Sequence, residues 1–124
     1  VLNTEFRVGD AESIPLEDNS VDAVVGNMVL HHCPNPKSAI KEMIRILKPK
    51  GRLVLADMEE HKEKWLQDEM ADLWLGFSLE QANEMLQIAG LKKVKVKLQR
   101  TKCCGISISG RKAEIGVFVA RGEK

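Results

Sequence analysis

The stretch VGDAESIPLEDNSVDAVVGNMVLHH, from Val8 to His32, contains two apolar runs separated by a polar loop. The first run belongs to a short strand that we predict over Glu5–Gly9, ending at Asp10. The second run, VDAVVGNMVL, is rich in valine and nearly all apolar, which is typical of a strand buried on both faces in a parallel sheet. An acid and an amide, Asp10 and Asn27, therefore stand at the ends of two predicted strands.

A helix and a further strand are predicted directly after this stretch. Asn35 is a suitable N-cap, Pro36 suits the first helical position, and apolar residues then recur at helical spacing as far as Leu47. The run GRLVLADM, residues 51–58, predicts the next buried strand. Strands that alternate with a helix in this way favour a parallel sheet with right-handed crossovers.

Two more helices are predicted in the middle of the chain. Residues 59–77, EEHKEKWLQDEMADLWLGF, begin with acids that suit a helix N-terminus and carry an apolar stripe at helical spacing. The stripe consists of Leu66, Met70, Leu73 and Trp74. Ser78 with Gln81 has the pattern of a capping box, and Gly90 suits the C-terminal cap of the helix that follows it.

The last third of the chain predicts an antiparallel strand pair. In residues 91–100, LKKVKVKLQR, lysines alternate with apolar residues, which is typical of a sheet edge with one wet face. The run AEIGVFVARG, residues 113–122, is apolar on both faces, so we place it between that edge and the parallel strands. Burial should therefore be greater at Ile115, Val117, Phe118 and Val119 than at Lys93, Lys95 and Lys97. The predicted fold class is α/β.

Composition restricts the function classes. The chain has 124 residues, enough for one domain with its own core, and a net charge of +1 that favours neither nucleic acid nor a membrane surface as a partner. Its apolar runs are far shorter than the roughly 18 residues of a membrane span. Cys33, Cys103 and Cys104 cannot all pair within one chain, which predicts a reduced, cytoplasmic protein.

Four pieces of the sequence carry a resemblance to a known family. These are GDAESIPL, NSVDAVVGNMVLHH, AIKEMIRILKPKGRLVLAD and FSLEQANEMLQIAGL, which follow in order between Phe6 and Ala120. Together they resemble the small-molecule branch of the class I S-adenosylmethionine-dependent methyltransferases. The resemblance implies a Rossmann-like fold, S-adenosylmethionine as cofactor, and transfer of its methyl group to a small-molecule acceptor.

The resemblance also implies roles for four residues at the predicted strand ends. Asp10 would bind the adenine amino group, and the backbone N–H of Ala11 would meet an adenine ring nitrogen. Asn27 and Met28 would lie beside the methionine part of the cofactor. Ligands of open parallel sheets bind at the carboxyl ends of strands, which agrees with this placing. The alternative is that Asp10 is an ordinary turn residue and Asn27 a strand terminator.

Parts of the family pattern are not among these residues. Relatives have an earlier strand with a glycine-rich loop, and a second strand whose terminal acid holds the ribose hydroxyls. Lys50 stands where glycine is common. We therefore expect residues 1–124 to form the C-terminal portion of a methyltransferase domain, and to bind S-adenosylmethionine weakly or not at all alone. A non-catalytic, self-associating half-domain is the alternative function, and a Rossmann-type oxidoreductase is a third.

This interpretation leaves a bare sheet edge at Asp22–Asn27, because relatives have another strand there. Unpaired backbone groups at such an edge need partners. We expect a homodimer that pairs two copies of this edge into one sheet. The alternatives are pairing of Glu5–Gly9 with the edge in the same chain, or a frayed N-terminal half.

Other residues allow more than one function. His31 and His32 invite a metal or general-base role, but neighbours on an extended segment point opposite ways, so we predict no metal site and keep only His32 as a candidate base. The three cysteines match no zinc spacing and are predicted to be ordinary thiols rather than a trap for a thiophilic metal. Trp65, Trp74 and Phe77 form either plain core or the cover of a substrate pocket. No catalytic residue is assigned from the sequence.

Overall fold

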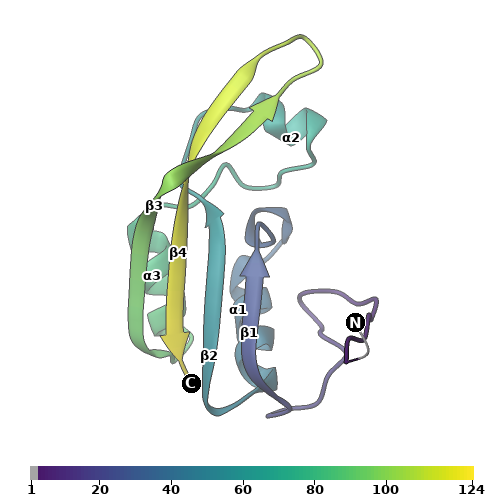
Figure 1. Cartoon of the computed structure of the whole chain (residues 1–124), viewed down its shortest axis with the longest axis vertical. Helices are drawn as coiled ribbons and strands as arrows, with labels where there is room; N and C mark the ends of the chain where they lie inside the picture. The colour runs from purple at the N-terminus through teal and green to yellow at the C-terminus, as the bar shows by residue number, and fades with distance from the viewer. Residues whose placement is uncertain (1–2) are drawn as a thin grey trace.

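The computed structural model describes residues 3–124 and contains one mixed sheet with two helices packed on one face (Figure 1). The strands are β1 (Val21–Asn27), β2 (Leu47–Met58), β3 (Lys92–Ile106) and β4 (Lys112–Glu123), in the order β1-β2-β4-β3. β1 and β2 are parallel, whereas β4 is antiparallel to both β2 and β3. The α/β fold and the insertion of the last strand beside the parallel pair are confirmed.

The helices begin where their capping residues predict. α1 (Pro36–Ile46) starts after Asn35, whose side chain accepts a hydrogen bond from the backbone of Ser38 at 3.2 Å. α3 (Leu79–Ile88) starts at Ser78, and both hydrogen bonds of the predicted capping box with Gln81 are present. The main core lies between these helices and the sheet, and includes Ile40, Leu55, Leu86 and Phe118, each at most 2% exposed.

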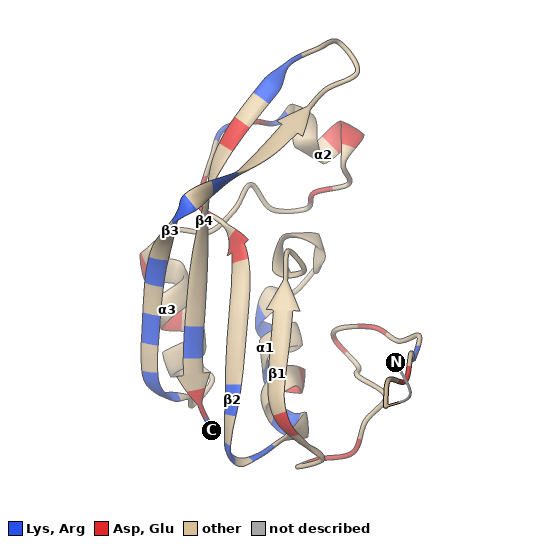
Figure 2. Cartoon of the chain, in the orientation of Figure 1, with Lys and Arg blue, Asp and Glu red and all other residues tan. Residues whose placement is uncertain are grey.

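The C-terminal strands follow the predicted burial pattern. Ile115 and Phe118 are buried and Val117 and Val119 are partly buried, whereas Lys93, Lys95 and Lys97 are exposed. Figure 2 shows the lysines as a row along β3, at the edge of the sheet. β3 and β4 continue beyond the predicted strands into a hairpin that projects past β1 and β2 (Figure 1). A second core cluster lies there, formed by Met58, Trp65, Leu66, Ala113 and Ile115.

Two predicted elements are wrong. Residues 3–20 contain no strand, so Glu5–Gly9 does not pair with β1, and Phe6 and Val8 are exposed. No neighbouring strand in the described chain supplies the hydrogen bonds that would hold this segment extended. The helix predicted within residues 59–77 is reduced to α2 (Trp65–Glu69), because only Leu66 of its apolar stripe is buried while Met70, Leu73 and Trp74 are 42–55% exposed.

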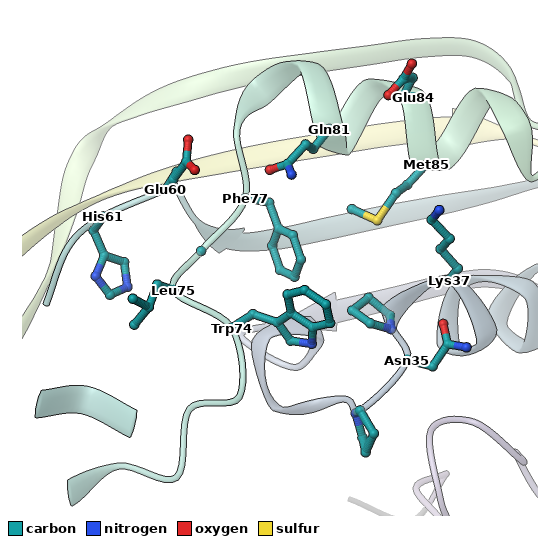
Figure 3. Close-up of a pocket in the computed structure, with 13 residues that line it drawn as sticks. Asn35, Lys37, Glu60, His61, Trp74, Leu75, Phe77, Gln81, Glu84 and Met85 are labelled. Carbon is teal, nitrogen blue, oxygen red and sulfur yellow. The ribbon is translucent and has the colours of Figure 1, made fainter. Parts of the chain in front are cut away.

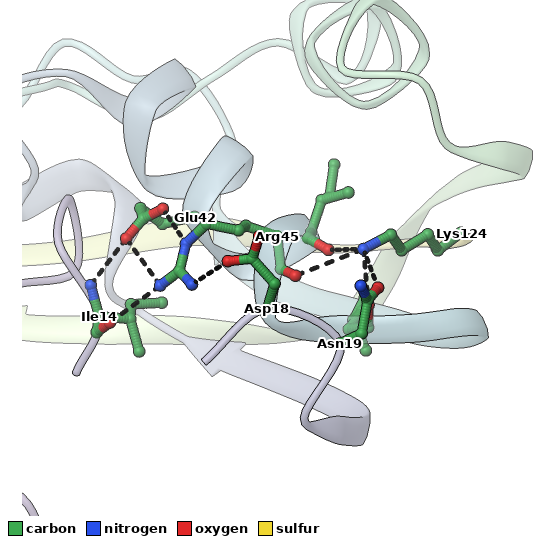
Figure 4. Close-up of polar contacts among 8 residues, drawn as sticks. Ile14, Asp18, Asn19, Glu42, Arg45 and Lys124 are labelled. Atoms are coloured by element: carbon green, nitrogen blue, oxygen red, sulfur yellow. Dashed lines mark hydrogen bonds and ion pairs between the residues drawn. The ribbon is translucent and has the colours of Figure 1, made fainter. Parts of the chain in front are cut away.

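Polar contacts hold the N-terminal loop and the C-terminus against α1 (Figure 4). The Arg45 guanidinium donates to Asp18 at 2.7 Å, to Glu42 at 2.6 Å and to the carbonyl of Ile14 at 3.0 Å. The ammonium group of Lys124 donates to the carbonyls of Ile44 and Leu47, at 2.7 and 2.6 Å. Lys124 thus places a positive charge and hydrogen-bond donors at the C-terminal end of α1, where the helix dipole favours a cation.

The position of Lys50 explains one departure from the family pattern. Lys50 has a φ of +68°, in the left-handed region that glycine adopts at little cost. Glycine would adopt this conformation with less strain than Lys50 does.

β1 forms the other edge of the sheet and pairs with β2 alone among the described strands. No helix within residues 3–124 has the length and apolar character needed to cross a membrane.

Candidate functional site

A group of ionisable side chains lies beyond the carboxyl ends of β1 and β2, which share one edge because the strands are parallel. His31 belongs to the short 3₁₀ helix η1 (Leu30–His32) that follows β1, and Asp57 is the penultimate residue of β2. The His31 ring contacts Asp57 through Nδ1 and Oδ1 at 2.7 Å, and the backbone N–H of His31 donates to Oδ2 at 3.3 Å. Both residues are buried.

The environment of His31 favours its charged form. Burial lowers the pKa of His31, but the hydrogen bond and the charge of Asp57, together with the charge of Asp72, outweigh burial and raise it above its ordinary value. Because Asp57 is an acceptor, the Nδ1 atom of His31 carries a proton and Nε2 faces Asp72, at 3.6 Å from Oδ1. Asp57 therefore fixes the orientation of the ring.

His32 joins the same group from the exposed side. Its Nε2 lies 3.8 Å from Oδ1 of Asp72, and its Nδ1 donates to the carbonyl of Ala71 at 3.1 Å. The expectation that His31 and His32 point opposite ways is wrong, because η1 is helical rather than extended and brings the ring centroids to 4.1 Å. We call His31, His32, Asp57 and Asp72 the His–Asp cluster.

His61 lies within electrostatic range of the His–Asp cluster. Burial lowers the pKa of His61, opposed by the charges of Asp72 and Glu63. Its Nδ1 accepts a hydrogen bond from the backbone N–H of Glu63 at 3.1 Å. Its Nε2 is buried and has no hydrogen-bond partner among residues 3–124. In the neutral ring this Nε2 carries the proton, so His61 offers a donor and no free lone pair.

A cavity of about 760 Å³ opens beside His61 (Figure 3). Trp74, Phe77 and Met85 provide its apolar wall, and Lys37 and Glu84 stand on α1 and α3 around it. Trp74 is held by a hydrogen bond from its indole N–H to the carbonyl of Cys33 at 2.8 Å. A pocket of this size, with a mostly apolar wall and a few polar groups, suits a small organic molecule.

The sequence allowed two roles, core or pocket cover, for three aromatic residues, and the structure shows both. Trp74 and Phe77 line the cavity, with ring centroids 6.1 Å apart. Trp65 instead belongs to the second core cluster and donates to Glu63 at 2.9 Å.

Asp10 and Ala11 line a separate pocket of about 320 Å³ with Arg7 and Pro15. One carboxylate oxygen of Asp10 accepts from the backbone N–H of Glu12 at 2.8 Å, which is the geometry of an ordinary Asx turn. Asp10 is exposed, and it follows a loop instead of the predicted strand. The turn role is therefore present, and the second carboxylate oxygen accepts no hydrogen bond within residues 3–124.

Asn27 and Met28 lie at the end of β1, where the sequence places them, but they do not line the pocket of Asp10. Asn27 is exposed. Met28 has a φ of +56°, and its backbone N–H donates to the carbonyl of Ala56 at 2.8 Å. The chain turns away from the sheet at this residue, which directs η1 toward Asp57.

The cysteines are free thiols. Burial raises the pKa of Cys33 and of Cys103, which disfavours the thiolate form that metals and electrophiles require. Cys103 and Cys104 lie in β3, which extends beyond the strand predicted over residues 91–100, and their side chains alternate across it.

Sequence patterns alone assign no role to Asp57, Asp72 or His61. Asp57 had a signal, because an acid that ends an apolar strand is the same pattern that drew attention to Asp10. No sequence signal pointed to Asp72, because it lies far along the chain from His31 in a segment predicted to be helical.

Comparisons with known proteins agree with this architecture. Residues 1–55 match the family model described as a methyltransferase domain. Over 53 residues, or 43% of its length, this chain is 45% identical to a demethylmenaquinone methyltransferase of Renibacterium salmoninarum. Over 69 residues, or 52% of the chain, it is 39% identical to the uncharacterized protein YafE of Escherichia coli. These matches span 22% and 33% of the relatives' own lengths.

Solved structures extend the likeness of fold to almost the whole chain. The YcgJ protein of Bacillus subtilis superposes with a TM-score of 0.73 over 98% of this chain and 71% of its own, at 18% identity. A methyltransferase-like protein of Bacillus halodurans gives a TM-score of 0.71 over 94% of this chain and 69% of its own, at 17% identity. The sequence match over residues 1–55 with a methyltransferase domain, and a fold shared with solved methyltransferases along nearly the full length, indicate a class I S-adenosylmethionine-dependent methyltransferase.

Proposed function

We propose that this chain takes part in methyl transfer from S-adenosylmethionine to a small-molecule acceptor, as the C-terminal portion of a larger methyltransferase domain. The observation that carries the proposal is the family match over residues 1–55, which contain Asp10, Ala11, Asn27 and Met28. The relatives' matched segments are also parts of longer proteins. The alternative remains a self-associating half-domain without catalytic activity.

The residues present fit the adenine end of the cofactor. An adenine edge needs an acceptor beside a donor, and the free carboxylate oxygen of Asp10 followed by the backbone N–H of Ala11 supplies both in one pocket. Asn27 offers a further amide at the end of β1. When bound, S-adenosylmethionine supplies an electrophilic methyl group on its sulfonium. The protein's contribution is to position the two reactants and exclude water.

The cavity beside His61 is the proposed acceptor pocket. Trp74 and Phe77 would cover the apolar part of the acceptor, while Lys37 and Glu84 would meet its polar groups. One relative is named a demethylmenaquinone methyltransferase and another a malonyl-[acyl-carrier protein] O-methyltransferase. Both names describe an organic methyl acceptor, and together they select none for this chain.

Titration of the ¹⁵N-labelled chain with S-adenosylmethionine tests the proposed contacts by NMR. We expect shifts of the backbone amides to gather at Asp10, Ala11, Asn27 and Met28, because these are the residues proposed to contact the cofactor. Asp10→Ala should remove most of the shifts near Ala11, since it deletes the adenine acceptor. Lys95→Ala is the matched control, because this exposed residue lies on β3 and its loss should leave the shifts unchanged. Shifts confined to other surfaces would contradict the assignment.

We also propose that two copies of the chain associate through the β1 edge. Pairing of Glu5–Gly9 with this edge is excluded by the structure, and Val25 is 74% exposed. Residues Ala23, Val24 and Val25 carry neither a charge nor a proline that would discourage strand pairing. Antiparallel pairing of two copies would satisfy the open backbone groups and cover Val25.

Sedimentation equilibrium should therefore give a dimer at high micromolar concentration. Val25→Lys should shift the chain toward monomer, because a lysine at the centre of the edge opposes pairing. Ile88→Lys is the matched control, since Ile88 is 76% exposed on α3, away from β1. A monomeric wild-type chain, or equal dissociation by both variants, would rule out this interface.

A further inference from the structure

We propose that His31, His32 and Asp72 form a binding site for a divalent transition-metal ion of the zinc class. One ligand atom from each residue lies within 4.8 Å of the others. The Nε2 atoms of His31 and His32 stand 3.6 and 3.8 Å from the same carboxylate oxygen of Asp72. Ligand atoms around a tetrahedral zinc ion are about 3.4 Å apart, given metal–ligand bonds of about 2.0–2.1 Å. Small side-chain movements would complete the geometry.

The hydrogen bonds of both rings favour metal binding. A histidine that binds a metal usually donates its other ring N–H to a carboxylate or a backbone carbonyl. His31 contacts the carboxylate of Asp57 through Nδ1, and His32 contacts the carbonyl of Ala71 through Nδ1. Neither partner can donate, so each Nδ1 carries the proton in the neutral ring, and the Nε2 lone pair then faces Asp72. An ion that binds there displaces the second proton of a charged His31. Both rings are thus held in the tautomer that a metal requires.

Asp72 supplies an anionic ligand, and its carboxylate accepts no hydrogen bond within residues 3–124. Its side chain is only 4% exposed, and its carboxylate is near the two histidine rings at ion-pair rather than hydrogen-bond distances. A buried carboxylate requires a charged or hydrogen-bonding partner. A divalent cation between the two Nε2 atoms and Asp72 would replace these long ion pairs with direct bonds to the carboxylate.

The donor set selects the kind of ion. Two imidazoles with one carboxylate suit zinc and other first-row transition metals, whereas magnesium and calcium prefer oxygen ligands. His61 is not a fourth ligand in this arrangement, because its Nδ1 already accepts from the backbone of Glu63. Three protein ligands leave a position for water or substrate. His32 is 45% exposed, so an ion can enter from its side.

Backbone conformation supports a built site. Ala71 and Met28 have φ values of +58° and +56°, which residues other than glycine adopt rarely. The conformation of Ala71, which precedes Asp72, places its carbonyl against His32. The conformation of Met28 turns the chain into η1. Strain of this kind is concentrated at functional sites.

The test uses the chelator-treated 124-residue chain, titrated with Zn²⁺ and Co²⁺ in reducing buffer without S-adenosylmethionine. We expect one ion per chain, and cobalt d–d bands without a thiolate charge-transfer band. In long-range ¹H–¹⁵N spectra, Zn²⁺ should shift the Nε2 resonances of His31 and His32 far more than their Nδ1 resonances. Because the cofactor is left out, failure here would leave the proposed methyl transfer untouched.

Variants decide which residues bind the ion. His32→Ala and Asp72→Asn should each weaken Zn²⁺ binding at least about tenfold. His32→Ala removes an exposed ring, so its folding should be preserved, which amide spectra would verify. His61→Ala is the matched control and should bind as the wild type does. Equal affinity of His32→Ala and wild type, a thiolate band with Co²⁺, or no binding at millimolar Zn²⁺ would each overturn the proposal, leaving His31 as a charged partner of Asp57 and Asp72.

Discussion

Calorimetric titration of S-adenosylmethionine into the 124-residue chain is expected to show binding about two to four powers of ten weaker than in a domain that also supplies the glycine-rich loop and the ribose-binding acid. Those groups would contribute at least two charge-assisted hydrogen bonds, each of about 1.5–3 kcal/mol. The chain retains the proposed adenine contacts of Asp10 and Ala11, so its affinity for S-adenosylmethionine should be measurable but low. A low-micromolar dissociation constant would contradict the expectation.

A companion titration makes this result specific. Adenosine contains the part of the cofactor that Asp10 and Ala11 are proposed to bind. It should therefore bind the chain nearly as well as S-adenosylmethionine does. A large preference for the complete cofactor would mean that residues of this chain, Asn27 and Met28 among the candidates, bind the methionine or ribose part strongly. That result would contradict the expected dependence of affinity on the glycine-rich loop and the ribose-binding acid.

Replacement of Asp57 by alanine is expected to destabilise the chain by about 3–5 kcal/mol, because it removes one partner of a buried charged pair. Asp57 is 0% exposed and accepts from the ring and backbone of His31, and from the backbone N–H of Met58 at 2.7 Å. Its loss would leave buried donors without partners. Since small domains are stable by about 5–15 kcal/mol, the variant would be close to unfolding. Urea denaturation at fixed chain concentration measures the change.

Asp68→Ala is the control for this experiment. Asp68 is an exposed acid on α2, and no ion pair involves it within residues 3–124. Its replacement should change the free energy of unfolding by about 0.5 kcal/mol or less. If Asp57→Ala had an equally small effect, the buried pair with His31 would not be a main support of the strand ends.

The features that local sequence determined are those with local physical causes. The N-cap of Asn35 and the capping box of Ser78 and Gln81 depend on residues three positions apart, so their pattern predicts α1 and α3 directly. Alternation along Lys93, Lys95 and Lys97 depends only on the two-residue period of a strand, and it placed β3 at the edge. The apolar composition of β4 likewise predicted an interior strand.

Tertiary structure decided the rest, because it depended on contacts between distant residues. Residues 5–9 have strand-like composition but no partner strand in the described chain, so they remain a loop. Residues 70–74 have helical periodicity, but the backbone N–H groups of Leu73 and Trp74 instead donate to the carbonyl of His31, which ends α2 early. The same contact carries Asp72 to the two histidines. The His–Asp cluster thus joins η1, β2 and the segment after α2, and no short-range pattern encodes a meeting of side chains so far apart in the chain.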